Sequence, residues 1–358
     1  MTTVATVRLF SALAILAAAS CSNHMDMGNH SIDARDISTT PLASAVTYDA
    51  VYVVNGGDHS VSVIDASTNA VTGAITLNNV LYPHHIYLSP DGTRLAIGVP
   101  GMDFSAGHHG SIAGMTGAVI VLAAQTGDLV AARTIMSMNH NAAFDPTGSE
   151  IWTCGMLSAG MAYILDATSL ELSDSIAVGA TPQEVTFTPG GRYAFVCNGG
   201  SNSVTVIDRS ARSVVTTIDV GRNPVGAWPG DNGVMYVDNE ESMTISAIDT
   251  TTLTVHHTYD LGFTPGMVAT GPGDELWITN SDSGAVAINR ATEDLSMGHI
   301  ATGAGAHGIA FNADRSRAYV TNQLAASVSV IDVATKSVIA TVSVGRKPNG
   351  IVWRRHSL

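Results

Sequence analysis

Short runs of alternating apolar and polar residues dominate the sequence after its first 45 positions. One such run recurs seven times, from VYVVN at 51–55 through AFVCN at 194–198 to AYVTN at 318–322. The other copies are LAIGV at 95–99, IWTCG at 151–155, MYVDN at 235–239 and LWITN at 276–280. Successive copies begin 44, 56, 43, 41, 41 and 42 residues apart. A period of this length indicates a repeat architecture in which each repeat is one structural unit.

Each repeat contains four predicted strands. The recurring run is the second strand, and it follows a first strand that ends in a Pro/Gly turn, as in VTFTPGG at 185–191. A third strand such as SVSVID at 327–332 and a fourth such as VIATVSVG at 338–345 complete the unit. Period-2 alternation between Gly, Pro and Asp turns predicts four-stranded antiparallel sheets, and no segment shows a convincing helical period. Seven such sheets arranged radially predict an all-β, seven-bladed β-propeller over residues 46–358.

The two ends of this repeat region are complementary. The chain begins with a second strand at 51–55 and finishes with GIVW at 350–353, which is a first strand. We therefore expect residues 51 to about 77 to pair with 350–353 in one blade. This pairing of the N-terminal strands with the C-terminal strand would close the ring.

The first 45 residues have the character of a targeting segment and a linker. Arg8 precedes an apolar run over 9–19, which is too short to span a bilayer and fits a signal peptide over 1–20. Ala18-Ala19-Ser20-Cys21 resembles a bacterial lipobox, in which Cys21 is lipidated. Residues 21–45 then predict a flexible, lipid-anchored tether. The expected location is the periplasmic side of a bacterial membrane; the alternative is a plainly cleaved signal peptide and secretion.

Composition narrows the classes of partner. The formal net charge of −14 argues against nucleic acid and against an anionic membrane surface, which leaves the lipid anchor as the expected membrane contact. Nothing in the pattern indicates an oligomer, so we expect a monomer. Cys154 and Cys197 are equivalent residues of neighbouring repeats, too far apart for a disulfide, and are predicted to be buried free thiols.

Histidine is concentrated where the first strands begin. These strands start on the same face as the loops that follow the second strands, and we call this face the top face. The opening residues of the seven first strands are His84, His140, Gln183, Val225, Gly266, His307 and Asn349. Turn chemistry does not require three imidazoles among seven such positions. We therefore expect His84, His140 and His307 to converge at the mouth of the central tunnel, whereas His85 is expected to face the opposite way.

A long loop on the top face adds further donor groups. The 56-residue step contains about 14 extra residues, which place a loop over 100–116 in the blade that carries His84. This loop and the segment before His140 contribute Met102, His108, His109, Met115 and Met138. Imidazole and thioether donors favour copper, with zinc as a weaker candidate. The plainer alternatives are that these residues serve only in packing and loop hydrogen bonds, or that they line a small-ligand pocket without metal. Glu184 is the one acidic residue near these positions and alone supplies no paired acid–base chemistry.

The motifs AYVTN, SVSVID and VSVGRKPNGI, which end at residue 351, resemble the YVTN β-propeller repeat family over nearly all of 46–358. This resemblance implies a propeller fold but little about function, because propellers host unrelated activities. Relatives of this type include cell-envelope proteins, lactonase-like enzymes and the d1-haem domain of cytochrome-cd1-type nitrite reductases. Three functions therefore remain open: a copper-binding envelope protein in metal handling or electron-transfer support, a non-catalytic scaffold for an envelope protein partner, and a d1-haem-like oxidoreductase or lactonase-like enzyme. No catalytic residue is assigned, and the d1-haem propeller has eight blades where seven are counted here.

Overall fold

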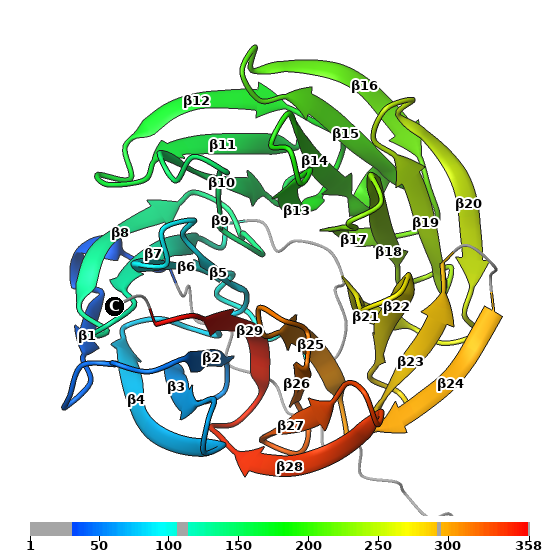
Figure 1. Ribbon diagram of the computed structural model, residues 1–358. Helices are drawn as coiled ribbons and strands as arrows, with labels where there is room; N and C mark the ends of the chain where they lie inside the picture. The colour runs from blue at the N-terminus through cyan, green and yellow to red at the C-terminus, as the bar shows by residue number, and fades with distance from the viewer. Residues whose placement is uncertain (1–30, 106–113, 292–294, 357–358) are drawn as a thin grey trace, which may run out of the picture.

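Seven antiparallel sheets surround a common axis in the computed structural model, which describes residues 31–105, 114–291 and 295–356 (Figure 1). This confirms the predicted all-β, seven-bladed propeller. Six of the sheets have four strands each in sequence order from the axis outward. These strands are β5 (Ile86–Leu88), β6 (Arg94–Val99), β7 (Gly117–Ala123) and β8 (Leu129–Ile135); β9 (Ala143–Phe144), β10 (Glu150–Gly155), β11 (Met161–Asp166) and β12 (Leu172–Ala177); β13 (Pro182–Phe187), β14 (Tyr193–Asn198), β15 (Ser203–Asp208) and β16 (Ser213–Asp219); β17 (Pro224–Pro229), β18 (Val234–Asn239), β19 (Thr244–Asp249) and β20 (Thr254–Asp260); β21 (Pro265–Thr270), β22 (Glu275–Asn280), β23 (Ala285–Arg290) and β24 (Leu295–Ala301); and β25 (Ala306–Phe311), β26 (Arg317–Asn322), β27 (Ser327–Asp332) and β28 (Ser337–Ser343).

The seventh sheet joins the two ends of the chain. It contains β2 (Ala50–Asn55), β3 (Ser60–Asp65), β4 (Ala70–Asn78) and the final strand β29 (Pro348–Arg354), with β29 innermost. Val51 of β2 is paired with Trp353 of β29. The predicted closure is therefore confirmed, and Figure 1 shows the blue and red strands side by side in one blade.

Part of the segment predicted as a flexible tether is built into the propeller. Residues 38–40 form β1 (Ser38–Thr40), which extends the closing sheet by pairing with the outer edge of β4. Ile32 and Ile37 are each only 5% exposed, and the N–H of Ile32 donates to Oγ1 of Thr116 at 2.7 Å. The flexible-tether prediction is thus wrong for 31–45, because the unpaired edge of β4 accepts another strand and the two isoleucines have apolar surface to bury. The rest of the tether, the signal segment and Cys21 lie outside the described residues.

The burial of the strands follows their distance from the axis. Every residue of β2 is buried, because both faces of a middle strand pack against neighbouring sheets. The outermost strand β28 alternates instead, with only one residue of seven fully buried. Apolar clusters between adjacent blades, for example around Trp152 and Trp277, therefore form the core as a series of wedges around the axis. Among the described residues, no helix is long and apolar enough to cross a membrane.

Candidate functional site

The innermost strands carry a two-residue interruption near the top face. In β13, Pro182 pairs with Asn198, but the next regular pair is Val185 with Val196. The same irregularity follows Pro224, Pro265, Ala306 and Pro348 in the other blades. In the blades of β5 and β9, the equivalent residues come just before the first strand. Two residues per blade therefore interrupt the regular pairing register, and we call them the first and second bulge positions.

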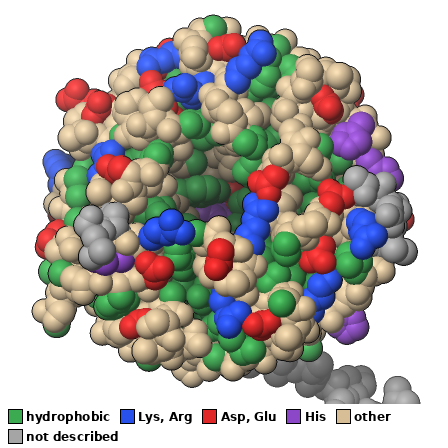
Figure 2. All heavy atoms as spheres, in the orientation of Figure 1, with side chains coloured by type: hydrophobic (Ala, Val, Ile, Leu, Met, Phe, Trp, Pro, Cys, Tyr) green, Lys and Arg blue, Asp and Glu red, His purple; other side chains and the backbone are tan. Residues whose placement is uncertain are grey.

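The first bulge positions hold the residues that the sequence singled out. The ring of His84 lies 4.4 Å from that of His140 and 5.6 Å from that of His307, measured between centroids. His84 and His140 are 1% and 0% exposed, and His307 is 8% exposed. The predicted convergence of these three imidazoles at the central tunnel is confirmed. Figure 2 shows a central hollow with a buried histidine side chain (purple) at its bottom.

The second bulge positions supply two functional residues that the sequence analysis did not assign. They are occupied by His85, Asn141, Glu184, Gly226, Met267, Gly308 and Gly350. The ring of His85 lies 4.6 Å from His84 and 4.7 Å from His140, so the expectation that His85 faces the opposite way is wrong. Alternation between faces holds within a regular strand, whereas His84 and His85 both precede β5. We refer to His84, His85, His140 and His307 as the imidazole cluster.

Glu184 places a carboxylate against the imidazole cluster. Its Oε1 lies 3.0 Å from Nε2 of His85 and 3.1 Å from Nδ1 of His140. Its Oε2 accepts hydrogen bonds from the Tyr87 hydroxyl at 3.1 Å and from Nδ2 of Asn141 at 3.5 Å. Glu184 is 1% exposed, and a carboxylate buried so deeply is stable only when it is paired or hydrogen-bonded. The contacts with two imidazoles and a phenol provide that compensation.

Tyr87 is held in the protonated form that such a contact requires. Burial raises the pKa of its phenol well above the usual 10.0, and the neighbouring carboxylate of Glu184 raises it further. The hydroxyl therefore remains a donor to Glu184 throughout the neutral range. Asn141 supports the same carboxylate from another blade, and its own amide is fixed by Val185, with Nδ2 donating to the Val185 carbonyl at 2.9 Å.

Three imidazoles of the cluster are arranged closely enough to share a metal ion. One ring nitrogen from each of His84, His85 and His140 lies within 4.8 Å of the other two. Tetrahedral coordination with metal–nitrogen bonds of about 2.0–2.1 Å places nitrogen atoms about 3.3 Å apart, so a bound ion would draw these rings closer together. Glu184 contacts two of these rings and would fix which nitrogen each presents to an ion, as acidic partners of metal-ligating histidines do.

The methionines of the predicted site lie in an adjoining apolar cluster. Met138 packs with Phe104 and Met156, and Met102 and Met115 contact this group from the long loop. The ring of Phe104 lies 5.8 Å from His84 and 5.3 Å from His140, which places this part of the loop over the imidazole cluster as predicted. These contacts form a hydrophobic cover, and the ligand role of the thioethers stays a prediction. His108 and His109 lie outside the described residues.

The two internal cysteines are buried between blades. Cys154 packs with Trp152 and Val185, and Cys197 lies in a separate apolar cluster. Both are free thiols, and burial raises the pKa of each well above the ordinary value of 9.0. They therefore stay protonated and unreactive, as predicted for structural cysteines.

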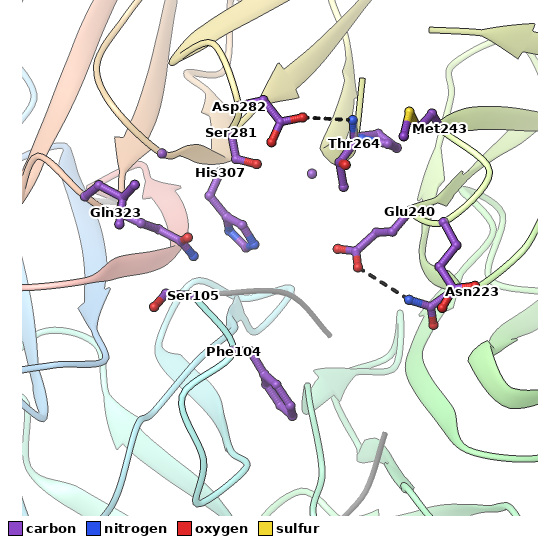
Figure 3. A pocket seen from close by; sticks show the side chains of 15 residues that line it. Phe104, Ser105, Asn223, Glu240, Met243, Thr264, Ser281, Asp282, His307 and Gln323 are labelled. Atoms are coloured by element: carbon purple, nitrogen blue, oxygen red, sulfur yellow. Dashed lines mark hydrogen bonds between the residues drawn. The ribbon is translucent and has the colours of Figure 1, made fainter. Parts of the chain in front are cut away.

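A cavity of about 490 Å³ adjoins the imidazole cluster, and we call it the vestibule. The residues that line it come mainly from the blades of β17, β21 and β25, together with Phe104 and Ser105 of the long loop. Figure 3 shows the side chains of His307 and Glu240 directed toward each other across it. A cavity of this volume accommodates a small molecule. The sequence could not reveal it, because its walls are loops from three separate repeats.

Comparison with known proteins supports the fold alone. No family model matches the sequence, and no curated protein matches it in a sequence search. Among solved structures, the chain is similar to the periplasmic gluconolactonase of Pseudomonas aeruginosa, with a TM-score of 0.68, 15% identity, and coverage of 86% of this chain and 99% of that chain. It is also similar to the dihydro-haem d1 dehydrogenase NirN (TM-score 0.63, 15% identity, 89% and 81% covered). Hydrazine synthase of Kuenenia stuttgartiensis gives a TM-score of 0.64 at 18% identity, with 75% and 89% covered. These neighbours are propellers, and identities this low carry no function.

Proposed function

We propose that this protein binds a transition-metal ion in the propeller tunnel through His84, His85 and His140. The observation that carries the proposal is the placement of three buried ring nitrogens within 4.8 Å of one another. His307, whose ring lies 5.9 Å from His85, is a candidate fourth ligand. A donor set of imidazoles suits copper, zinc, iron and nickel, and among divalent ions copper binds such sites most tightly. Copper is therefore the preferred ion, with zinc second.

The setting of this activity belongs to the same proposal. The signal segment over 1–20 and Cys21 support a lipid-anchored protein of the bacterial envelope, acting in metal handling or electron-transfer support. AYVTN at 318–322 and SVSVID at 327–332 support assignment to the YVTN-repeat propellers. Labelling of the expressed protein with a radioactive fatty acid tests the anchor, and a Cys21→Ala variant should lose the label.

Metal titration of the purified protein tests the site. After treatment with a chelator, the protein should bind Cu²⁺ or Zn²⁺ with micromolar or tighter affinity by calorimetry, with a stoichiometry of about one at this site. The triple variant His84→Ala/His140→Ala/His307→Ala should lose this binding event. His256→Ala, which alters an exposed imidazole on the outer strand β20, should retain it. Binding weaker than micromolar, or binding unchanged in the triple variant, would refute the proposal.

Glu184 is assigned a positioning role. Glu184→Gln keeps the size of the side chain and removes the charge that faces His85 and His140. Loss of such a partner typically weakens metal affinity by 10–100-fold, so we expect a change of about that size in calorimetry. The Cu²⁺ electron paramagnetic resonance spectrum should also shift, because the ring orientations change. A spectrum and an affinity identical to those of the wild type would show that Glu184 does not orient the ligands.

Hydrolysis of a small lactone is the second candidate function. It is supported by the vestibule beside His307 and by the fold shared with a gluconolactonase. A metal-bound water would supply the nucleophile at neutral pH. Gluconolactone hydrolysis that rises above the spontaneous rate on addition of Zn²⁺, and disappears in His140→Ala, would favour this activity over metal handling. A pure scaffold would show neither metal binding nor turnover.

A further inference from the structure

The segment that follows β6 is held to the closing blade by an ion pair. Nζ of Lys347 is paired with Oδ2 of Asp103, although 244 positions separate the two residues in the chain. The backbone of Lys347 is itself fixed, because its carbonyl accepts a hydrogen bond from the N–H of Gly56 at 2.9 Å and the next residue begins β29. The carboxylate of Asp103 also accepts a hydrogen bond from the N–H of Ser105 at 3.0 Å. The residues from Asp103 to Ser105 are therefore held against a rigid part of the propeller.

Phe104 lies in the middle of this segment and covers the imidazole cluster. It is only 2% exposed, and its ring lies 5.8 Å from that of His84 and 5.3 Å from that of His140. Met138 and Met156 pack with the same ring. His84 and His140 are themselves no more than 1% exposed. While the Phe104 ring is in place, a reagent or an ion therefore cannot reach these two imidazoles from the side of the loop.

The approach from the vestibule is too narrow for a metal ion with its bound water. The vestibule meets the cluster at His307 through a second cavity, which is also lined by His85 and Glu184. This second cavity has a volume of about 10 Å³, which is about the space that one water molecule needs. Phe104 forms part of the wall of the much larger vestibule (Figure 3). Movement of its ring would therefore open the vestibule directly onto the imidazole cluster.

The contact that holds this segment is weak enough to be reversible. The side chains of Lys347 and Asp103 are 36% and 26% exposed. An ion pair with this much exposure contributes little to stability and is screened by salt. Gly101 lies two residues before Asp103 and has a φ of +81°, a conformation that glycine adopts without strain. The segment thus combines a weak attachment with a residue at which the backbone can turn.

We propose that Phe104 is a gate over the imidazole cluster and that the Asp103–Lys347 ion pair keeps this gate closed. When the pair opens, the ring moves aside and His84 and His140 become accessible from the vestibule. The gate itself stands on these contacts alone, whereas its control of metal entry and release rests on the proposed metal-binding function. The two parts are therefore tested with different measurements.

Histidine modification of the metal-free protein tests the gate. Diethyl pyrocarbonate acylates accessible imidazoles, and peptide mass spectrometry locates the product. His140 should react about two- to five-fold faster in Lys347→Met than in the wild type, because loss of a partly exposed ion pair shifts an equilibrium by about that factor. Methionine keeps an apolar side chain beside Tyr82, whose ring centre lies 5.8 Å from Nζ of Lys347. The exposed His256 should react at the same rate in both proteins.

The other lysine of the chain provides the matched control. Lys336 also forms an ion pair, with Oε1 of Glu275 at 2.6 Å, and Lys336→Met should leave the rate at His140 unchanged. The thiols of Cys154 and Cys197 are 0% exposed, so they should stay unreactive toward a thiol reagent in every variant that remains folded.

A second pair of measurements does not depend on the folding of Lys347→Met. Rising salt should accelerate the reaction of His140 in the wild type, because it screens the ion pair. Phe104→Ala removes the ring and should give a fast reaction that salt no longer changes. A rate at His140 that responds to neither Lys347→Met nor salt, or an equal acceleration in Lys336→Met, would overturn the proposal.

Control of metal exchange is tested with Co²⁺, followed by its absorption in stopped flow. Lys347→Met should take up Co²⁺, and release it to a chelator, faster by the same factor of about two to five, so that the dissociation constant stays unchanged. A residue that merely stabilised the bound ion would alter release alone. Rates equal to those of the wild type would overturn the control of metal exchange. Absence of any Co²⁺ spectrum in the wild type would instead refute the metal-binding function, while the reactivity of His140 still decides the gate.

Discussion

At the scale of single residues, the site depends on polar groups whose burial is compensated by specific partners. The sequence predicted three of its imidazoles, because reading one equivalent position in every repeat exposes His84, His140 and His307. It missed His85 and Glu184, which occupy the next position in their repeats and contact each other at 3.0 Å. The local departure from strand alternation could not be foreseen from apolar patterning, although the side-by-side pairs His84-His85 and Gln183-Glu184 in the same register were a usable signal.

Asp238 is a second buried carboxyl group, and its destabilising effect on the folded state should be measurable. It is 1% exposed, and its Oδ1 accepts hydrogen bonds from Nε1 of Trp228 at 2.6 Å and from the N–H of Gly226 at 3.1 Å. Burial raises its pKa well above the usual 3.8, and nearby Glu240 raises it further. The folded state therefore retains a proton that the unfolded chain has lost, so this carboxyl group lowers stability as pH rises above about 4.

Asp238→Asn keeps the oxygen acceptor and removes the titration. We expect the variant to gain at least about 1 kcal/mol relative to the wild type between about pH 4 and pH 7, since each pKa unit is worth about 1.4 kcal/mol. Urea unfolding at several pH values measures this difference. Asp314→Asn is the control, because hydrogen bonds from Ser316 lower the pKa of the Asp314 carboxyl. The difference in unfolding free energy between this variant and the wild type should therefore stay constant above about pH 5. A pH-independent difference for Asp238→Asn would contradict the assignment.

At the scale of strands, the sequence repeat determines the order of strands in each blade and the positions at which neighbouring inner strands come close together. Alternation and turn residues were enough to predict the four strands of each blade and their order. They did not predict β1, because Ser38-Thr39-Thr40 has no apolar pattern and pairs only because the edge of β4 is available. They also gave no reason for the glycines at three of the second bulge positions, Gly226, Gly308 and Gly350.

Gly308 illustrates why a side chain is excluded from such a position. A Cβ atom there would lie 2.4 Å from the carbonyl oxygen of Asn349 and 3.0 Å from Oγ1 of Thr321. The first of these atoms belongs to the backbone of the neighbouring inner strand and cannot rotate away. Gly308→Ala should therefore lower the free energy of unfolding by about 1–3 kcal/mol, as overpacking typically does.

Urea unfolding of Gly308→Ala against Gly190→Ala gives the matched comparison. Gly190 lies in the turn between β13 and β14, and a Cβ atom there would meet nothing within 4 Å. Its substitution should leave stability within about 0.5 kcal/mol of the wild type. Equal effects of the two substitutions would mean that the inner strands separate more easily than their close contact indicates.

At the scale of the whole molecule, closure brings distant segments of the chain to one axis. The seven repeats and the leftover first strand at 350–353 were sufficient to predict both the fold and its closure. The vestibule was not predictable, since the shape of a cavity depends on loop conformations from several blades. The candidate ligands and their acidic partner come from four blades, those that begin with β5, β9, β13 and β25.

An ion held by these residues would add a link between blades that already meet through side-chain packing, hydrogen bonds and ion pairs, so binding should raise the stability of the entire propeller. A ligand at 100 times its dissociation constant stabilises the folded state by about 2.7 kcal/mol, which for a chain of this size corresponds to a rise in Tm of roughly 4 °C. Thermal unfolding with and without Zn²⁺ measures the shift, and His84→Ala/His140→Ala/His307→Ala should abolish it while His256→Ala does not. A shift of equal size in the triple variant would place the stabilising ion at a site other than the imidazole cluster.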